Sequence, residues 1–327
     1  MKRETIVLKE SAASANCGCC PKERPVTEYI KKGVVNLDKP KGPTSHEVAS
    51  WVKKILHIGR AGHSGTLDPG VTGLLPVMLG DATRAVDALR LSGKEYVCLM
   101  RLHRRTQSTL IKEVCKEFTG AIYQTPPIKS AVKRELRIRH IYYINILELT
   151  STEVLLQIGC EAGTYIRKLC HDIGLAIGCG AHMQELRRTG AGPLTEDTAV
   201  TLHALKDAYT VWIEEGDERE LRTVIQPVEN ALIHLPRITI FDTAVDAICH
   251  GAPLATPGIT SIETSINNGD NVAIYTLKGE IVAIATASLS TDDVINKKKV
   301  IAATTKHVLM NPNTYPMHWK KRRAEVV

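Results

Sequence analysis

One carboxylate in this sequence is surrounded by residues that favour turns. Asp68 lies in GHSGTLDPGVTGLL, residues 62–75, which holds four glycines, one proline and no other acidic residue. Glycine permits backbone conformations that other residues resist, and Pro69 fixes φ directly after the acid. We therefore predict a tightly shaped loop that presents Asp68, followed by a buried strand or helix. A loop of this composition can also be purely structural, and these residues alone leave that alternative open.

Three other patterns come close to known motifs without completing them. The tetrapeptide GHSG at 62–65 is followed by Thr where a GxSxG nucleophile elbow needs a glycine. The pair GK at 93–94 has Ala88 where a phosphate-binding P-loop needs its first glycine. His171 and Asp172 are adjacent on a predicted helix and point to different sides of it, which disfavours a metal site. A serine hydrolase, a P-loop enzyme and a metal centre are all disfavoured.

Tyr96 and Arg167 are the side chains that could act together with Asp68. Apolar and β-branched residues predict a strand over 94–102, which carries Tyr96. Thr164 is the predicted cap of a helix that ends at Gly178, so Arg167 lies in its first turn. The sequence pattern does not itself bring these side chains together.

The remaining elements predict an α+β fold with a mainly antiparallel sheet. A strand over 34–37 precedes a helix capped by Ser45, and a further helix over 110–120 ends on a glycine. Strands over 136–149 and 153–162 form a hairpin, and such short connections are typical of antiparallel sheets. From about residue 230, short strands with Gly and Pro between them predict a small β-barrel-like module.

Composition and charge narrow the class of protein. With 43% hydrophobic and 24% charged residues over 327 positions, the chain resembles a soluble globular protein of about two domains. It has no apolar run long enough for a membrane span and no secretory h-region, so we expect an intracellular protein without a membrane partner. Residues 101–139 contain ten Lys or Arg against three Glu, and HWKKRR follows at 318–323. Such clusters are typical of a protein with a polyanionic partner, although a solvated basic face is an equal alternative.

The cysteines indicate a reducing compartment. Nine are scattered along the chain without the even, regular spacing of a disulfide framework. Cys17, Cys19 and Cys20 form the cluster CGCC, but no second CxxC pair could complete a zinc site. We therefore expect CGCC to belong to a mobile terminal segment.

Several stretches, in their order and spacing, resemble the TruB family of pseudouridine synthases. They are NLDKPKGPTSHEV, AGHSGTLDPGVTGLLPVMLGDATR, GKEYVC and CEAGTYIRKLCHDIG, within residues 31–205. QTPPIKSAVKRELRIRHIYYINILE and GAHMQELRRT narrow the resemblance to the archaeal and eukaryotic dyskerin branch. HGAPLATPGI resembles the RNA-binding PUA module of that branch. The resemblance covers about nine-tenths of the chain, and the CGCC leader lies outside it.

The resemblance implies a division into a pseudouridine synthase catalytic domain and a C-terminal PUA domain. The expected boundaries are an N-terminal extension over 1–30, the catalytic domain over 31–232, the PUA domain over 233–318 and a basic tail over 319–327.

The resemblance also implies roles for individual residues. Asp68 is the nucleophile that attacks the target uridine and leads to cleavage of the base–sugar bond, after which the base turns and is rejoined through carbon. Tyr96 stacks on the flipped base and Arg167 pairs with Asp68. A nucleophile must be held at one angle, so Gly65 and Gly70 are expected to permit the turn, Pro69 to stiffen it and Leu67 to anchor it. The implied contacts with the target uridine are made by His63, Tyr165, Ile166 and Leu186, and those with RNA by Arg104, Arg105, Lys129, Lys133, Arg134, His250 and Gly251.

The implied function is the RNA-guided conversion of uridine to pseudouridine in rRNA, and also in tRNA, by the catalytic subunit of an H/ACA ribonucleoprotein. The implied partners are a guide RNA, a target RNA and three small protein subunits, of the zinc-binding, glycine-rich and kink-turn-binding types. No cofactor and no metal are expected. A stand-alone synthase acting on the T-arm of tRNA and a catalytically silent RNA scaffold are the alternatives. Because the sequence stops four residues after KKRR, without a long Lys-rich tail, we expect an archaeal, cytoplasmic member.

Overall fold

A computed structural model describes residues 3–126 and 133–317 of the chain. The chain forms two compact units, each with its own hydrophobic core. The central unit contains residues 35–77 and 89–225, and the terminal unit contains residues 1–34, 78–88 and 226–327. The chain passes between the units inside two strands, β2 (Gly33–Lys39) and β4 (Thr72–Leu79). Within the described residues, no helix is long and apolar enough to cross a membrane.

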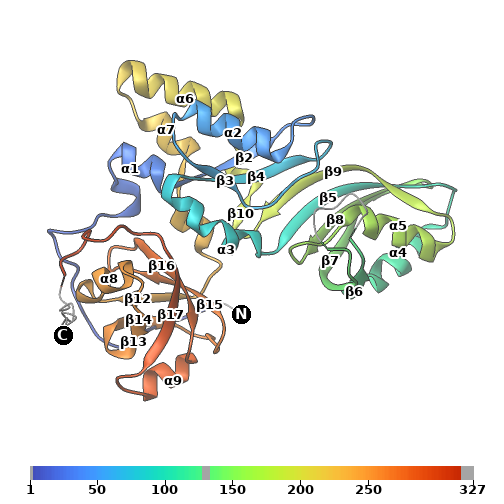
Figure 1. The fold of residues 1–327 in the computed structure, drawn as a ribbon. Helices are drawn as coiled ribbons and strands as arrows, with labels where there is room; N and C mark the ends of the chain where they lie inside the picture. Colours follow the sequence, from blue (N-terminus) through green and yellow to red (C-terminus); the bar gives the residue numbers. More distant parts are fainter. Residues whose placement is uncertain (1–2, 127–132, 318–327) are drawn as a thin grey trace. The chain divides into compact units, whose positions relative to one another are not determined.

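The central unit is built on a long, mainly antiparallel sheet, as expected (Figure 1). Its strand order is β2-β4-β9-β5-β8-β7-β6, with β3 beside β4 and β10 beside β9. The pair β4 and β9 is parallel, while β5 is antiparallel to both of its neighbours. The remaining strands of this unit are β3 (Ala61–His63), β5 (Lys94–Leu102), β6 (Gly120–Gln124), β7 (Arg137–Leu149), β8 (Glu153–Cys160), β9 (Ala181–Ala191) and β10 (Leu194–Thr195).

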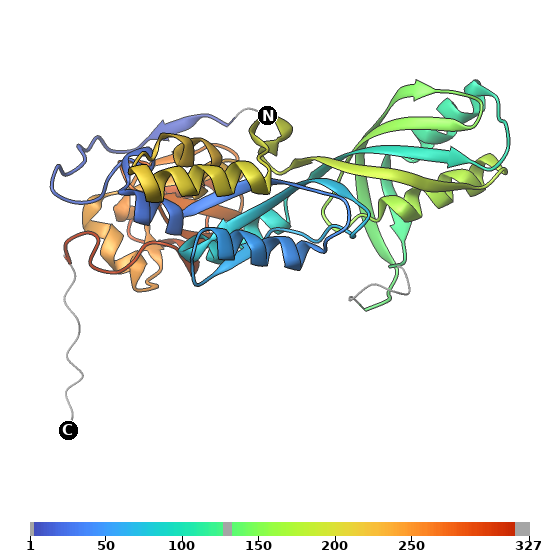
Figure 2. The ribbon, with the colours of Figure 1, turned by 90° about the horizontal axis from the view of Figure 1, so that it is seen from above.

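Helices bury one face of this sheet. α5 packs on β9 and β5, and α4 packs on α5 and β7, so that the core of the unit lies between them and the strands (Figure 1). Figure 2 shows the twist of the strands around these two helices. The helices whose residues lie in the central unit are α2 (Ser45–Ile55), α4 (Ser108–Glu117), α5 (Ile166–Ile177), α6 (Leu202–Glu215) and α7 (Arg219–Val224), and α3 (Val86–Arg90) lies where the chain re-enters it.

Helix ends differ from the sequence prediction by one to three residues, for local reasons. The cap of α2 is Thr44 rather than Ser45, because Thr44 forms a reciprocal capping box with Glu47. Thr164 does not cap α5; its hydroxyl donates to the carbonyl of Glu161, and the cap position is Tyr165. α4 ends at Glu117, whereas the C-terminal end of α5 at Gly178, which has a left-handed conformation, is as predicted.

The terminal unit is a seven-stranded sheet in the order β1-β14-β12-β15-β16-β17-β13, which confirms the β-rich module expected there. Its strands are β1 (Thr5–Val7), β12 (Arg237–Ile240), β13 (Leu254–Ala255), β14 (Ile259–Glu263), β15 (Asn271–Tyr275), β16 (Ile281–Ala287) and β17 (Ile301–Val308). The short strand β11 (Gln226–Pro227) pairs with the first residues of β2. The helices of the terminal unit are α1 (Val26–Lys31), α8 (Asp242–Cys249) and α9 (Thr291–Asn296).

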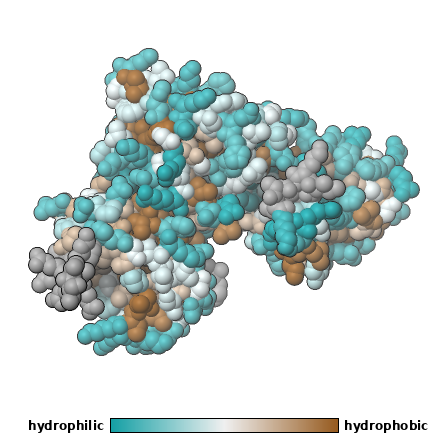
Figure 3. Space-filling model, in the orientation of Figure 1, coloured by the Kyte–Doolittle hydropathy of each residue, from teal (hydrophilic) through white to brown (hydrophobic). Residues whose placement is uncertain are grey.

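Exposed apolar side chains of the chain are scattered as separate patches over the face that Figure 3 shows.

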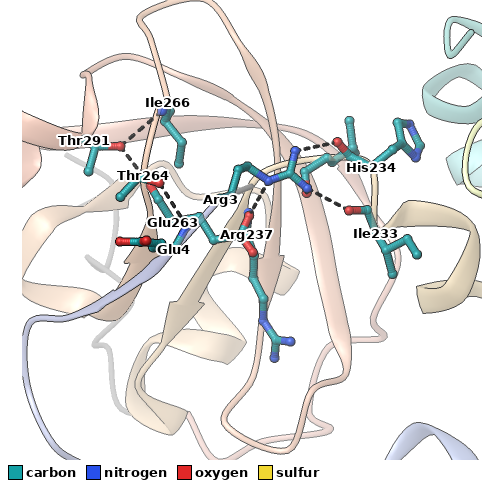
Figure 4. Close-up of polar contacts among 10 residues, drawn as sticks. Arg3, Glu4, Ile233, His234, Arg237, Glu263, Thr264, Ile266 and Thr291 are labelled. Carbon is teal, nitrogen blue, oxygen red and sulfur yellow. Dashed lines mark hydrogen bonds and ion pairs between the residues drawn. The ribbon is translucent and has the colours of Figure 1, made fainter. Parts of the chain in front are cut away.

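The N-terminal leader is part of this unit. β1 pairs antiparallel with β14, and Arg3 lies beside that pairing (Figure 4). The Arg3 guanidinium forms an ion pair with Glu263 at 2.8 Å and donates to the backbone carbonyls of Ile233, His234 and Leu235. One side chain thereby satisfies three consecutive carbonyls where the chain enters β12.

The expectation that the CGCC cluster belongs to a mobile terminal segment is wrong. The Lys278 ammonium donates to the carbonyls of Cys17 at 2.7 Å and of Gly18 at 3.0 Å, and Cys17 packs against the core of the terminal unit. Gly18 has a φ of +65°, and a Cβ there would lie 2.1 Å from the hydroxyl of Tyr315. The leader is therefore fitted against this unit, at a position that only glycine allows.

Candidate active site

Asp68 and Arg167 meet although 99 residues separate them. The Arg167 Nη2 lies 2.5 Å from the Asp68 Oδ2. Arg167 lies in the first turn of α5, and Asp68 lies in the loop between β3 and β4. The side chains are 61% and 58% exposed, so the pair is open to solvent and to a ligand. The arrangement offers an oriented carboxylate to whatever binds over it.

Local hydrogen bonds hold the loop on either side of Asp68. The Ser45 hydroxyl accepts from the Leu67 N–H at 2.8 Å and donates to the Leu67 carbonyl at 3.0 Å. Leu67 is only 4% exposed, which agrees with the anchoring role expected of it. The Val71 N–H donates to the Asp68 carbonyl, and the Gly42 N–H donates to the Pro69 carbonyl. The residues before and after the carboxylate are therefore fixed.

The glycine requirement of the loop differs in part from the expectation. Gly65 has a φ of +149°, which favours glycine as predicted. The expectation for Gly70 is wrong, because its φ is not positive and a Cβ there would meet open space. Gly73 needs to be glycine instead: its φ is +97°, and a Cβ would lie 2.2 Å from the backbone oxygen of Arg188.

Two buried cations bind the backbone of this loop. The Lys39 ammonium donates to the carbonyls of Pro40, Pro69 and Val71, and the side chain is fully buried. Burial lowers the pKa of Lys39, and the negative charge of Asp68 acts in the opposite direction. The loop that carries the acid therefore lies against a buried ammonium.

Arg188 plays a similar part at the two ends of the loop. Its Nε donates to the Leu74 carbonyl at 2.6 Å, and its Nη2 donates to the Gly65 carbonyl at 3.2 Å. The residue is only 2% exposed. The guanidinium thus joins the residues that precede and follow Asp68 in the chain.

Tyr96 lies directly across from Arg188 in the pairing of β5 with β9. It is half-buried against the core of the central unit. Burial raises the pKa of the Tyr96 phenol, while the charge of Arg188 and a hydrogen bond from it act to lower that pKa.

His63 is kept neutral near this loop. Burial lowers the pKa of the His63 imidazole, and the charges of His46 and Arg188 lower it further. Its ring meets that of His46 edge-on, with centroids 4.8 Å apart. Among the described residues, the buried His63 Nδ1 has no hydrogen-bond partner.

The other implied contacts with uridine lie around the start of α5 and on β9. Gln124 exchanges two hydrogen bonds with the backbone of Tyr165, which fixes the entry to the helix. Ile166 is buried in the core, and Leu186 packs against that core from β9.

The implied RNA contacts are spread over the chain. Arg104 is exposed and donates to the Gly178 carbonyl at 2.7 Å, and Arg105 is exposed beside it. Lys133 pairs with Glu135, and Arg134 is exposed. In the terminal unit, the His250 ring lies 2.8 Å from the Asp246 carbonyl, and Gly251 follows with a φ of +84°. Lys129 and the HWKKRR cluster lie outside the described residues.

Sequence reasoning missed Lys39, Arg188, Gly73 and His46. All four lie inside stretches already singled out: Lys39 and His46 in NLDKPKGPTSHEV, Gly73 in GHSGTLDPGVTGLL and Arg188 in GAHMQELRRT. For Lys39 and Arg188, the sequence offered one sign: each is a basic residue within one of these stretches, and a basic residue needs a partner when it is buried.

Comparisons with known proteins place this geometry in a family. Models of a TruB family pseudouridylate synthase (N terminal domain) and of a tRNA pseudouridylate synthase B C-terminal domain match residues 53–166 and 167–233. The probable tRNA pseudouridine synthase B of Methanosarcina barkeri is 60% identical over 325 residues, which cover 99% of this chain and 96% of the relative. The chain belongs to the TruB family of pseudouridylate synthases. It is therefore a pseudouridine synthase, an isomerase.

Solved structures of family members agree with this assignment. A chain in the crystal structure of a Cbf5-Nop10-Gar1 complex is 52% identical, with a TM-score of 0.93 and 97% of each chain covered. A chain in the structure of an H/ACA RNP bound to a substrate RNA containing 2'-deoxyuridine is 49% identical, with a TM-score of 0.92 and 98% of each chain covered. Both likenesses cover nearly the whole chain, including the stretches that resemble the dyskerin branch.

Two further models match the residues outside the synthase domains. A PUA domain model matches residues 236–309, and a DKCLD (NUC011) domain model matches residues 1–49. The second match includes Cys17, Cys19 and Cys20. The statement that the CGCC leader lies outside the resemblance is therefore wrong, in agreement with its packing on the terminal unit.

Proposed function

We propose that this TruB-family synthase is the catalytic subunit of an RNA-guided H/ACA ribonucleoprotein and converts uridine to pseudouridine in rRNA. The observation that carries the proposal is the exposed Asp68–Arg167 pair, held on a loop that two buried cations fix. The likeness over nearly the whole chain to chains in a Cbf5-Nop10-Gar1 complex and in an H/ACA RNP with substrate RNA supports the guided mode.

In this proposal Asp68 attacks the sugar of the target uridine and the bond between base and sugar breaks. The base then turns and its C5 bonds to the sugar carbon, as the bond between that carbon and the carboxylate breaks. The proton on C5 is then lost and the freed N1 takes one up, so that product and substrate are isomers. Arg167 orients the Asp68 carboxylate, and Tyr96 stacks on the flipped base. His63, Tyr165, Ile166 and Leu186 shape the uridine pocket. A carboxylate held this firmly suits covalent catalysis, since a misplacement of ~1 Å can cost ~100-fold in rate.

A guide RNA would present the target uridine unpaired, at a cost of a few kcal/mol for extruding it. Arg104, Arg105, Lys129, Lys133 and Arg134 would contact phosphates without reading sequence. His250 and Gly251 would contact the guide RNA from the PUA domain. The protein partners would be the subunits named with Cbf5 in the related structures, Nop10 and Gar1, together with a kink-turn-binding subunit. We place this assembly in the cytoplasm of an archaeon.

A stand-alone activity on tRNA is the second candidate. The curated relatives are named probable tRNA pseudouridine synthase B, at 60% identity in Methanosarcina barkeri and 52% in Pyrococcus furiosus. tRNA is therefore a second substrate class that the same Asp68 site would serve.

One assay separates the candidates. The purified chain is incubated with a tRNA transcript alone, and with an rRNA fragment in the presence and absence of an H/ACA guide and the small subunits. Pseudouridine is then measured by base analysis. Guided use predicts product in the rRNA fragment only with the guide, and stand-alone use predicts product in tRNA without it. No product in any mixture would mean that the chain acts as a silent scaffold.

A further inference from the structure

The pairing of β5 with β9 contains a β-bulge beside Tyr96. Glu95 pairs with Gly190 and Tyr96 pairs with Arg188, so that Thr189 is an extra residue in β9. Successive side chains of a strand point to opposite faces, so in a regular strand Arg188 and Gly190, which are two apart, would share a face. In a regular ladder Tyr96 would therefore lie opposite Thr189, with Arg188 on the other face of the sheet. The bulge is what brings Arg188 to the face of Tyr96.

Glu95 holds this bulge from the opposite face. Its Oε1 accepts from the Thr189 hydroxyl at 2.7 Å. Its Oε2 accepts from the Tyr143 hydroxyl at 2.5 Å and from the Gln157 Nε2 at 3.1 Å. Burial raises the pKa of Glu95, but these hydrogen bonds outweigh it and the pKa is lowered overall. One carboxylate thus joins β5 to β7, β8 and β9.

The backbone around Glu95 is shaped to allow this network. Glu95, Gly159 and Tyr143 lie in one row across three strands, because Gly159 pairs with both of the others. A Cβ at Gly159 would lie 2.3 Å from the Tyr143 ring, and a Cβ at Gly190 would lie 3.0 Å from the Glu95 Cβ. The two glycines that pair with Glu95 therefore have different effects. Gly159 on β8 lets the Tyr143 ring cross over that strand, and Gly190 on β9 keeps the bulge close to the Glu95 carboxylate.

We propose that Glu95 is a positioning residue for the pseudouridine synthase reaction: it fixes the Thr189 bulge and so holds Arg188 and Tyr96 on one face of the sheet. The inference rests on the proposed role of Tyr96. Arg188 in turn bonds the carbonyls of Gly65 and Leu74, at the two ends of the Asp68 loop. Through the Arg188 guanidinium, the bulge therefore aligns Tyr96 with the loop that carries Asp68.

The test uses Glu95→Ala and the near-isosteric Thr189→Val in the assembled complex. We expect the single-turnover rate of bound RNA to fall ~10–100-fold in Glu95→Ala and ~10-fold in Thr189→Val, with RNA affinity unchanged. Because both changes release the same contact, the double variant should be no slower than Glu95→Ala. Glu95→Gln should recover most of the rate, because the amide oxygen still accepts and the hydroxyls of Tyr143 and Thr189 can reverse.

Glu153→Gln is the matched control, since Glu153 is an acid on β8 whose carboxylate pairs with Arg101 at the surface. A second readout does not depend on activity: a 3-fluorotyrosine placed at position 96 reports the surroundings of the ring by its 19F resonance. Glu95→Ala and Thr189→Val should both shift this resonance, and Glu153→Gln should not.

The outcomes separate the two proposals. If the unmodified complex forms no pseudouridine, the proposed function fails, and the 19F resonance alone decides whether Glu95 positions Tyr96. If the unmodified complex is active while Glu95→Ala keeps its bound rate and its resonance, the positioning role is overturned.

Discussion

The two units bury their cations in different ways. In the terminal unit, Arg24 is buried against a carboxylate, with its Nη1 and Nη2 at 3.0 and 2.6 Å from the two oxygens of Glu229. In the central unit, Lys39, Lys94 and Arg188 are buried against backbone carbonyls. Among the described residues, none of these three has a carboxylate at ion-pair distance.

The neutralised pair in the terminal unit stabilises the fold of that unit, whereas Lys39 and Arg188 in the central unit support the loop of Asp68. Arg24 and Glu229 neutralise each other, and Glu229 also accepts from the Ile281 N–H, so the pair joins segments of the terminal unit without leaving net charge. Carbonyl oxygens satisfy the donors of Lys39 and Arg188 but do not cancel their charge. Uncancelled positive charge therefore remains beside the loop that carries Asp68.

The largest expected effect on pseudouridine formation comes from changing Asp68, the carboxylate on this loop. Asp68→Asn should reduce pseudouridine formation more than ~1000-fold, because the amide is nearly isosteric but is not a competent nucleophile. Folding and RNA affinity should stay near those of the unmodified chain. Base analysis of the product RNA measures the loss, with Asp172→Asn on α5 as the control that keeps activity. Turnover by the purified Asp68→Asn variant would remove Asp68 from the role of nucleophile.

Breaking the neutralised pair should cost stability rather than activity. Arg24→Met leaves the Glu229 carboxylate buried without a countercharge, and should lower the free energy of unfolding by ~3–5 kcal/mol. Adding Glu229→Gln should restore part of this loss. Urea titrations measure both, with Lys297→Met, whose partner Asp293 is at the surface, as the unaffected control. If Arg24→Met alone were as stable as the double variant, the buried pair would not be the cause.

Arg167 and the basic segment should respond in opposite ways. Arg167→Ala should lower the single-turnover rate in saturating complex ~100-fold, which equals about 2.7 kcal/mol, because Asp68 loses its partner. The pair is exposed in the free chain, so folding stability should not change. Neutralising Arg104 and Arg105 should instead weaken RNA binding and flatten its salt dependence by about one unit per lost phosphate contact. An Arg167→Ala variant that loses affinity but keeps its bound rate would contradict the pairing.

The smallest effect concerns Lys94. Burial and, to a lesser degree, the charge of Arg188 lower the pKa of this ammonium to about 7. The unfolded chain therefore binds more protons than the folded chain above that pH, and stability gained from this group rises with pH. Between pH 7 and 8.5, the unfolding free energy of the unmodified chain relative to Lys94→Met should increase by at most ~1.4 kcal/mol per pH unit. Parallel pH curves would show that the bonds to carbonyls keep Lys94 charged.

The strand bounds and helix ends that the sequence predicts correctly are set by residues close together in the chain. The strand Lys94–Leu102 has the predicted bounds, because Gly93 precedes it directly and most of its residues from Tyr96 onward are apolar, aromatic or β-branched. The end of α5 at Gly178 was predictable for the same reason. The cap of α2 also had a local sign, since Glu47 lies three residues after Thr44 and not after Ser45.

What the sequence does not predict depends on distant segments. Ser45 was available to bond Leu67 because another residue caps the helix, and Gly73 must be glycine because β9 passes beside it. The meeting of Asp68 and Arg167 came from resemblance and not from any pattern in the chain. The packing of the CGCC leader escaped notice because its partners lie some 260 residues away.

The pairing of β1 with β14 has a consequence for the order of folding during synthesis. Thr5 pairs with Glu263, so the first strand leaves the ribosome 258 residues before its partner. At roughly 5–20 residues per second, that strand waits about 13–50 s with unpaired backbone groups, while the whole central unit is translated. A short strand with few hydrogen bonds to offer is a weak template for wrong partners during this time. The terminal unit, although it begins the chain, is the last part of the molecule able to fold.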